Sequence, residues 1–186
     1  HEVARTYVLY RQKRAEARAK EVSHKKSSKA PGLNVLDGGI RKPLDLAELN
    51  TLVQSACEAL GNEVDPNLIV TETLKNVYDG VPVEELRKSA IMSARSMIEI
   101  EPAYTYVTAR LLLHTIRSEV LGEVASQQEM KTRYAEYFPE FVRKGIKAEL
   151  LDPKLGTFDL KRLGAAIDSG RDLKFDYLGL QTLYDR

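Results

Sequence analysis

Residues Leu33–Asp45 read Leu-Asn-Val-Leu-Asp-Gly-Gly-Ile-Arg-Lys-Pro-Leu-Asp, and this stretch decides the fold. Apolar residues stand on both sides of Asp37-Gly38, a dipeptide typical of tight hairpin turns because glycine tolerates the positive φ that such turns require. The stretch predicts two short strands, near Leu33–Leu36 and Ile40–Leu44. A two-stranded ribbon is only marginally stable alone, so we expect it to pack on the helices that follow.

Four amphipathic segments follow the hairpin, up to Gly122. The first repeats apolar residues at i, i+3, i+4 and i+7 and stops near Gly61, where a glycine suits a helix C-cap. A proline stands at the start of each of the other three, at Pro66, Pro82 and Pro102. We expect the apolar stripes of these helices to form the core, and Cys57 and Met97 to be part of it.

Two further parts flank this one. Residues 1–20 have apolar positions at helical spacing, and the polar, lysine-rich stretch 23–32 is predicted to be a linker. The last part is predicted to be helical and turn-rich, with helices around 123–137, 139–150, 159–167 and 177–185. The expected domains are therefore 1–32, 33–122 and 123–186. The expected fold class is mostly α, with a small β-hairpin cap on a four-helix unit, followed by a helical extension.

Composition and motifs exclude several kinds of function. The chain has 186 residues, a net charge of +1 and one cysteine, which suits a reducing, cytoplasmic compartment. No apolar run approaches the roughly 20 residues of a membrane span, and no signal peptide is recognisable. The sequence has no Walker loop, CxxC, HExxH or GxSxG motif, and His114 is expected to be structural. We therefore expect no catalytic residues, no metal site and no membrane partner. Because it opens within a helical pattern without an initiator Met, the chain is expected to be a piece of a longer protein.

Several short stretches resemble one enzyme family. Val77–Val81 and Pro102–Leu112 resemble the ATP-cone and following helix of the large (alpha) subunit of class I ribonucleotide reductase. Tyr134–Phe138, Gly145-Ile146 and Arg171–Tyr177, together with Leu180–Leu183, resemble the helical region that leads into its catalytic barrel.

The resemblance covers Leu33–Arg186 and implies a ribonucleoside-diphosphate reductase, an oxidoreductase that makes deoxyribonucleotides for DNA synthesis. This segment would be its non-catalytic regulatory and structural N-terminal region. ATP and dATP would be allosteric effectors of the whole subunit. The partners would be the rest of the alpha subunit, other alpha chains and the radical-carrying beta subunit.

The family pattern also indicates candidate nucleotide-binding residues. The first helix resembles the last helix of a preceding cone, in which a basic residue near Lys13 or Arg14 approaches the nucleotide phosphates. Without the rest of that cone, this site is incomplete here. The fourth-helix basic position of the complete cone falls on Ser118.

The cone at 33–122 departs from the family pattern. Nucleotide-competent cones carry a Lys-Arg pair directly before the Asp-Gly turn, and here these positions are Val35 and Leu36. Apolar side chains neither neutralise a triphosphate nor satisfy its oxygens. The third-helix position that is polar or His in binding cones falls on Val83 or Arg87. We therefore expect a degenerate cone that binds neither ATP nor dATP. The weak candidates that remain in it are Asp37, Gly38, Arg41, Lys42 and Arg87.

A second hypothesis comes from the basic stretch at 5–29. From Arg5 to Lys29 there are nine Lys or Arg residues and two Glu residues. This pattern suits a helical nucleic-acid-binding module, whose binding would depend strongly on salt. Such a charge run is more often a solvated helix face followed by a flexible linker, and the family resemblance makes a nucleic-acid partner unlikely.

Overall fold

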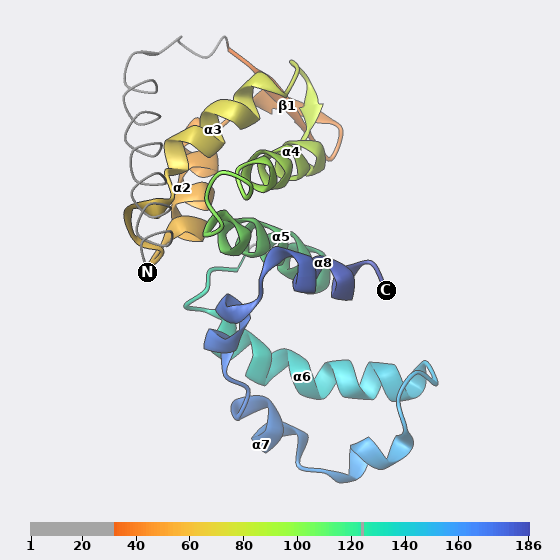
Figure 1. Cartoon of the computed structure of the whole chain (residues 1–186). Coiled ribbons are helices and arrows are strands. Elements are labelled where there is room, and N and C mark those ends of the chain that lie inside the picture. The colour runs from red at the N-terminus through yellow and green to blue at the C-terminus, as the bar shows by residue number, and fades with distance from the viewer. Residues whose placement is uncertain (1–31, 124) are drawn as a thin grey trace, which may run out of the picture. The chain divides into compact units, whose positions relative to one another are not determined.

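The computed structural model describes residues 32–123 and 125–186. The chain divides into two compact units, 1–32 and 33–186, and every element described below belongs to the second unit (Figure 1). The predicted first helix and linker lie outside the described residues, as do Lys13 and Arg14.

The predicted hairpin is present. Strand β1 (Asn34–Asp37) pairs antiparallel with β2 (Ile40–Pro43), and Asp37 stands opposite Ile40. Gly38 and Gly39 form the two-residue turn with φ values of 54° and 84°. Both values are positive, as a type I′ hairpin turn requires, and this explains why two glycines stand there.

The prediction of a lone hairpin was wrong, because a third strand joins it. Strand β3 (Val81–Pro82) runs parallel to β1, so that the strand order is β2-β1-β3. A strand of two residues is too short to show a periodicity in the sequence. The pairing of β3 with β1 depends on contacts between distant parts of the chain. One of these is the 2.8 Å hydrogen bond from the backbone N–H of Gly80 to the carbonyl of Asn34.

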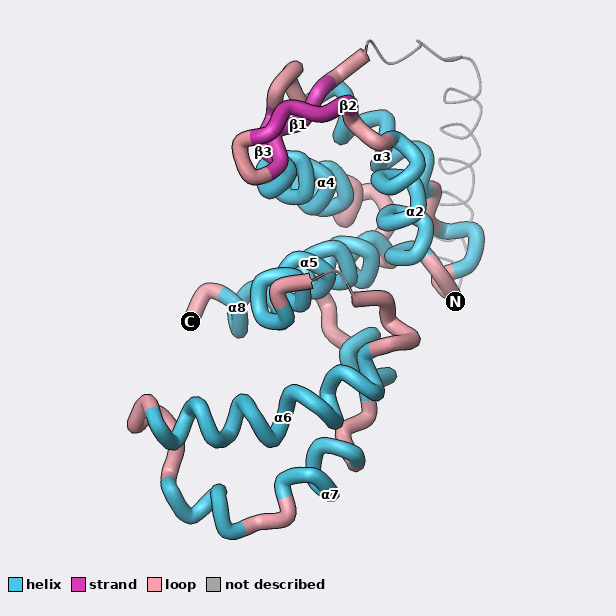
Figure 2. The backbone as a smooth tube through the Cα atoms, turned by 180° about the vertical axis from the view of Figure 1, so that it is seen from behind, coloured by secondary structure: helices cyan, strands magenta, loops and turns pink. Residues whose placement is uncertain are grey.

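Four helices support this sheet: α2 (Leu46–Cys57), α3 (Pro66–Lys75), α4 (Val83–Ser96) and α5 (Tyr104–Leu121). The sheet lies over α3 and α4 at one end of the helix group (Figure 2). One core joins sheet and helices and includes Val35, Val53, Ile69 and Val107, each 3% exposed or less. The expected mostly α fold with a small β cap is therefore confirmed.

Helix α2, the first one after the hairpin, ends earlier than predicted. Helix α2 stops at Cys57, Ala59 adopts a left-handed φ of 60°, and Gly61 opens a short 3-10 turn, η1 (Gly61–Glu63). Arg110 of α5 donates hydrogen bonds to the carbonyls of Ala56 and Glu58 at 3.0 and 2.6 Å. A cation at a helix C-terminus satisfies carbonyls that have no partner within the helix, so the stop at Cys57 depends on a distant residue.

The last part contains η2 (Pro153–Thr157), α7 (Leu160–Ala165), η3 (Ser169–Lys174) and α8 (Tyr177–Tyr184). Before them, α6 (Met130–Lys147) is one continuous helix, so the predicted start at 123 and the predicted break before Pro139 were both wrong. Proline has no N–H to donate to the carbonyl of Ala135. Gly164 of α7 lies against that backbone, and a Cβ added to it would come within 3.0 Å of the Ala135 carbonyl oxygen. The packing of α7 thus supports α6 across its proline.

No helix within 32–123 or 125–186 is long and apolar enough to cross a membrane.

Replacing Gly38 by Val tests the turn. We expect the free energy of unfolding to fall by about 1 kcal/mol or more, because a β-branched residue is strained at positive φ. A Cβ at Gly38 would meet no atom within 4 Å, so the effect isolates backbone strain. Gly32→Val is the matched control, since its Cβ also meets nothing and its φ is not in the left-handed region. Equal denaturation midpoints for the two variants would contradict the turn conformation.

Candidate nucleotide-binding site

The hairpin carries both of its cations in ion pairs. Lys42 donates a hydrogen bond to the Asp37 carboxylate at 2.7 Å, across the two strands. Arg41 pairs with Asp79, which lies in the turn before β3. The four side chains together carry no net charge, so the hairpin offers a phosphate chain no surplus of positive charge.

Asp79 connects the turn before β3 to both strands of the hairpin. Its carboxylate accepts hydrogen bonds from the backbone N–H and the side-chain amide of Asn34, both at 2.8 Å, besides pairing with Arg41. The hydrogen bonds from Asn34 lower the pKa of this carboxyl, and the charge of Arg41 adds a smaller contribution in the same direction. Asp79 therefore fixes the start of β1 to the turn before β3.

The pleat of the sheet separates the two hairpin cations. Val35 stands directly opposite Lys42, and Leu36 directly opposite Arg41. Directly paired residues point to the same face and successive residues alternate. Lys42 and Asp37 therefore share the helix-facing side with the buried Val35, whereas Arg41 points to the other side with Leu36.

Arg87 completes the helix-facing group. Its guanidinium lies 3.3 Å from the hydroxyl of Ser118, so the third-helix and fourth-helix positions of the family pattern do meet. The ion pair with Lys42 is the main reason that the pKa of Asp37 is lowered, and Arg87 contributes weakly to it. The structure thus places Asp37 and Lys42 in contact, with Gly38 in the adjoining turn and Arg87 near enough for its charge to act on Asp37, and places Arg41 on the opposite face.

The two positions at which the family resemblance expects cations, Val35 and Leu36, carry apolar side chains. Val35 is 3% exposed and belongs to the main core, whereas Leu36 lies on the other face and is half-buried. Elsewhere in the unit, burial lowers the pKa of His114, and the charges of Arg87 and Arg117 lower it further, so its protonated form is disfavoured.

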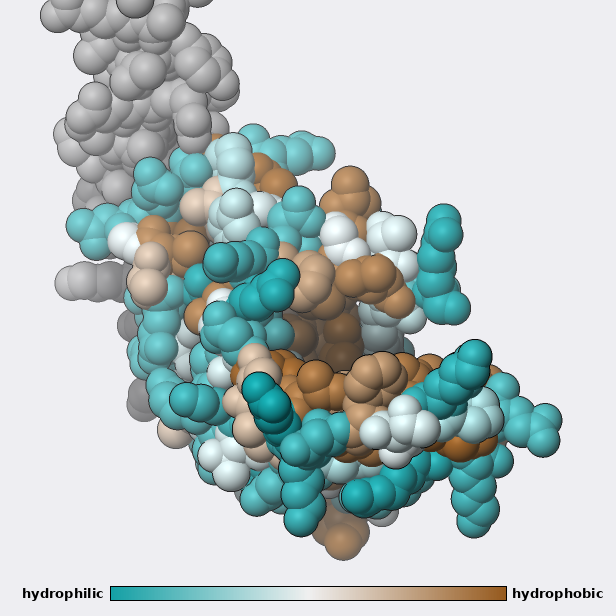
Figure 3. All heavy atoms as spheres, turned by 90° about the horizontal axis from the view of Figure 1, so that it is seen from below, coloured by the Kyte–Doolittle hydropathy of each residue, from teal (hydrophilic) through white to brown (hydrophobic). Residues whose placement is uncertain are grey.

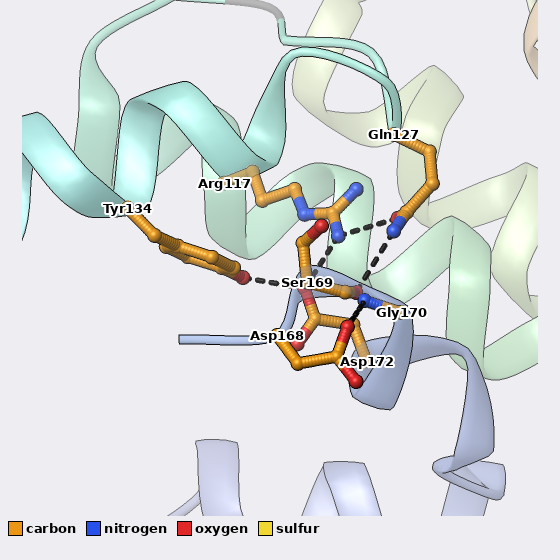
Figure 4. A network of polar contacts seen from close by, with 7 residues as sticks. All are labelled: Arg117, Gln127, Tyr134, Asp168, Ser169, Gly170 and Asp172. Atoms are coloured by element: carbon orange, nitrogen blue, oxygen red, sulfur yellow. Dashed lines mark hydrogen bonds and ion pairs between the residues drawn. The ribbon is translucent and has the colours of Figure 1, made fainter. Parts of the chain in front are cut away.

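Two groups of residues were not among the predicted site residues. The first is Asp79, the partner of Arg41. A buried network of Arg117, Gln127, Tyr134 and Asp172 was not predicted at all (Figure 4). Nothing in the sequence signals it, because its members lie in four separate segments.

A pocket of about 260 Å³ lies away from the sheet, between α6 and the segment that leads into α7. Its lining residues are Arg143, Gly156, Phe158, Asp159, Leu160 and Lys161. Asp159 is already engaged as the N-cap of α7, with its carboxylate accepting from the N–H of Arg162 at 3.0 Å. Among the lining residues, Asp159 is the one carboxylic acid, and none is a His or a Cys.

The space-filling view from below shows a face of the molecule on which apolar side chains surround a hollow, with hydrophilic side chains around it (Figure 3).

The described part of the chain holds neither a metal-binding cluster nor an activated thiol. It contains no cluster of three or more His, Cys, Asp or Glu side chains that could hold a metal ion. Burial raises the pKa of the Cys57 thiol to about 11, which makes it a poor nucleophile near neutral pH. Cys57 packs against the main core, as expected.

The fold and the site define a small helical module capped by a three-stranded sheet, whose hairpin cations are held in ion pairs. Comparison with known proteins shows that the chain belongs to the family of ribonucleoside-diphosphate reductase alpha subunits, which confirms the resemblance. No family model matches it. The alpha subunit of Chlamydia muridarum is 31% identical over 98% of the chain, and that of Chlamydia trachomatis is 32% identical over 99%. The Helicobacter pylori subunit is 31% identical over 78%.

The chain spans 17–18% of the length of these curated relatives. Nothing in the comparisons supports the nucleic-acid-binding hypothesis, and the basic stretch 5–29 on which it depends lies outside the described residues. The roles proposed for Asp37, Gly38, Arg41, Lys42 and Arg87 stay predictions.

The lowered pKa of Asp79 predicts an acid-dependent loss of stability. A carboxylate with a lowered pKa in the folded state stabilises the fold above its unfolded pKa of about 3.9, and this contribution is lost as the pH falls through the folded value. We expect the thermal midpoint of Asp79→Asn to be lower than wild type at pH 7 but to fall less between pH 5 and pH 2.

Asn34→Ala is the companion variant, because it removes one donor and keeps the carboxylate. Its acid-dependent loss should lie between those of the wild type and Asp79→Asn. If Asp79→Asn lost as much stability on acidification as the wild type, the Asn34–Asp79 contacts would not hold this carboxylate ionised.

Proposed function

We propose that this chain is a non-catalytic regulatory and structural segment from the N-terminal region of a ribonucleoside-diphosphate reductase alpha subunit. The full-length subunit would reduce ribonucleotides to deoxyribonucleotides in the cytoplasm. The similarity of nearly the whole chain to a fraction of such subunits supports this proposal. The family resemblance implies cysteine-based radical chemistry, and Cys57 is the one cysteine of this chain, so the reaction would take place elsewhere in the subunit.

The second part of the proposal is that the cone at 33–122 binds no nucleotide. The observation that carries it is the internal neutralisation of the hairpin, with Lys42 on Asp37 and Arg41 on Asp79. A triphosphate binds where several cations or amide donors converge. On the helix-facing side, Arg87 alone would add charge to a neutral pair, and Arg41 points to the opposite face. We therefore propose that ATP and dATP, the effectors of the family, are not bound at 33–122.

The remaining role is structural. The module keeps a continuous core from β1 to α5 while lacking the cationic pair of binding cones. Such a module is retained for its surfaces, which would contact the rest of the alpha subunit or other alpha chains. Through these it would influence nucleotide-dependent assembly and the pairing with the radical-carrying beta subunit.

Calorimetric titration of the chain with ATP and with dATP, each with Mg²⁺, tests the ligand-free proposal. We expect a dissociation constant weaker than about 1 mM, corresponding to less than about 4 kcal/mol of binding free energy. A micromolar constant would overturn the proposal. Arg87→Met and Arg41→Met then form a matched pair, because a site on the helix-facing side needs Arg87 and not Arg41.

Deletion of residues 33–186, the whole compact unit, from the full-length alpha subunit tests the structural role. We expect ribonucleotide reduction to persist, because the reaction would take place elsewhere in the subunit, and dATP-dependent assembly followed by light scattering to change. Retained activity serves as the control for folding. If assembly and inhibition by dATP both survived unchanged, the segment would be a passive remnant.

A further inference from the structure

Helices α5 and α8 pack side by side, although 55 residues separate the end of one from the start of the other in the numbering. Leu180 and Tyr177 of α8 join the same core as Leu111 of α5. The N–H of Tyr177 donates to the Thr105 hydroxyl at 3.2 Å, near the start of α5. The hydroxyl of Tyr184 donates to Glu119 at 3.0 Å, near its end. The two helices therefore run parallel. The chain between them leaves the helix pair at the end of α5 and returns to the start of α5, where α8 begins.

The segment between α5 and α8 has buried residues of its own. Helices α6 and α7, with η2 between them, pack on each other below the α5–α8 pair, and residues 130–165 are here named the α6–α7 lobe (Figure 1). Met130, Val142 and Leu160 are 1%, 4% and 9% exposed. None of them belongs to the main core that joins the sheet to α2–α5 and α8. The lobe thus buries apolar side chains that lie outside the main core.

One buried polar network holds the lobe to the rest of the unit. Arg117 of α5 pairs with Asp172 of η3 at 2.6 Å and donates to Gln127 at 2.7 Å. The hydroxyl of Tyr134 in α6 donates to the same oxygen of Asp172 at 2.5 Å. Gln127 in turn donates to the carbonyl of Ser169 at 2.9 Å.

The network therefore joins both connections of the lobe (Figure 4). Gln127 lies on the segment that enters the lobe, and Asp172 lies on the segment that leaves it. Arg117 belongs to neither connection and anchors both to α5. Gln127 lies in a turn and Asp172 in the 3-10 turn η3, and hinges form at a few loop or element-terminal residues of this kind.

The contact between the lobe and the rest of the unit depends on a largely buried ion pair, unlike an apolar interface. The side chains of Arg117 and Asp172 are 9% and 16% exposed, so both charges are largely removed from water. The gain from pairing such charges is offset by the loss of their hydration, whereas removing one partner leaves an uncompensated buried charge. The Nε of Arg117 has no hydrogen-bond partner among the described residues, so rehydration would satisfy a group that is unsatisfied when the network is closed.

We propose that the Arg117–Asp172 network is the lock of a hinge, about which the α6–α7 lobe opens as a unit while the sheet, α2–α5 and α8 stay folded. Opening exchanges a buried ion pair for two hydrated charges and leaves the main core and the apolar contacts within the lobe intact. Cooperative units that open below the global unfolding transition are a recognised property of native proteins. The lock gives this segment two states that a partner of the lobe would distinguish.

Hydrogen exchange followed by mass spectrometry on the 186-residue chain tests the lock. Asp172→Asn removes the charge that balances Arg117. We expect amide exchange in peptides from the α6–α7 lobe to accelerate about tenfold or more, and peptides from α2–α4 to remain unchanged. Tyr134→Phe removes one hydrogen bond without unbalancing a charge, and a smaller acceleration confined to the lobe is expected for it.

Lys144→Met is the matched control. It breaks the exposed pair of Lys144 with Glu140 at 2.8 Å, which lies within the lobe and away from the buried network, so lobe exchange should not change. The single variants Arg117→Met and Asp172→Leu each leave one charge unbalanced, whereas the double variant replaces the ion pair by an apolar contact, so its lobe exchange should be slower than that of either of these two single variants. Acceleration spread evenly over α2–α8 would overturn the proposal, because lobe and core would then be one cooperative unit. Unchanged lobe exchange in Asp172→Asn, or a double variant as open as the singles, would overturn it equally.

Discussion

Helix α5 is buried on most of its surface, and this burial is the constraint around which the described unit is arranged. Val107 and Thr108 are both fully buried, and the Thr108 hydroxyl donates back to the carbonyl of Tyr104 within the helix. A helix that is apolar on most sides needs neighbours on most sides. Helices α2, α4 and α8 and the turn η3 supply them.

Four polar side chains of α5 form hydrogen bonds or ion pairs with the surrounding elements. The Tyr104 hydroxyl accepts from the N–H of Asp65 at the start of α3, and Arg110 donates to the last carbonyls of α2. Thr105 accepts from the first N–H of α8, and Arg117 pairs with η3. Because each contact satisfies a backbone group or a charge that would otherwise be unpaired, the positions of the neighbouring elements are coupled to one helix.

Local features were predictable from the sequence and non-local ones were not. The hairpin follows from Asp37-Gly38, and the start of α3 from Asp65 and Pro66, because turn and cap chemistry acts within a few residues. The strand β3, the early end of α2 and the continuity of α6 through Pro139 each depend on a partner far along the chain. The same holds for the site. The apolar character of Val35 could be read directly, but the pairing of Arg41 with Asp79 required the fold.

The parallel course of α5 and α8 has a topological consequence. Helix α5 has 18 residues and a length of about 27 Å, at 1.5 Å per residue. An extended chain would return over that distance in about eight residues, at roughly 3.3–3.6 Å each. The chain spends a far longer segment on this return, and the segment builds two helices and buries apolar side chains outside the main core. By length, then, the return path is free to vary in size without disturbing the helix pair that it joins, and it is the natural place for insertions and deletions to accumulate among relatives.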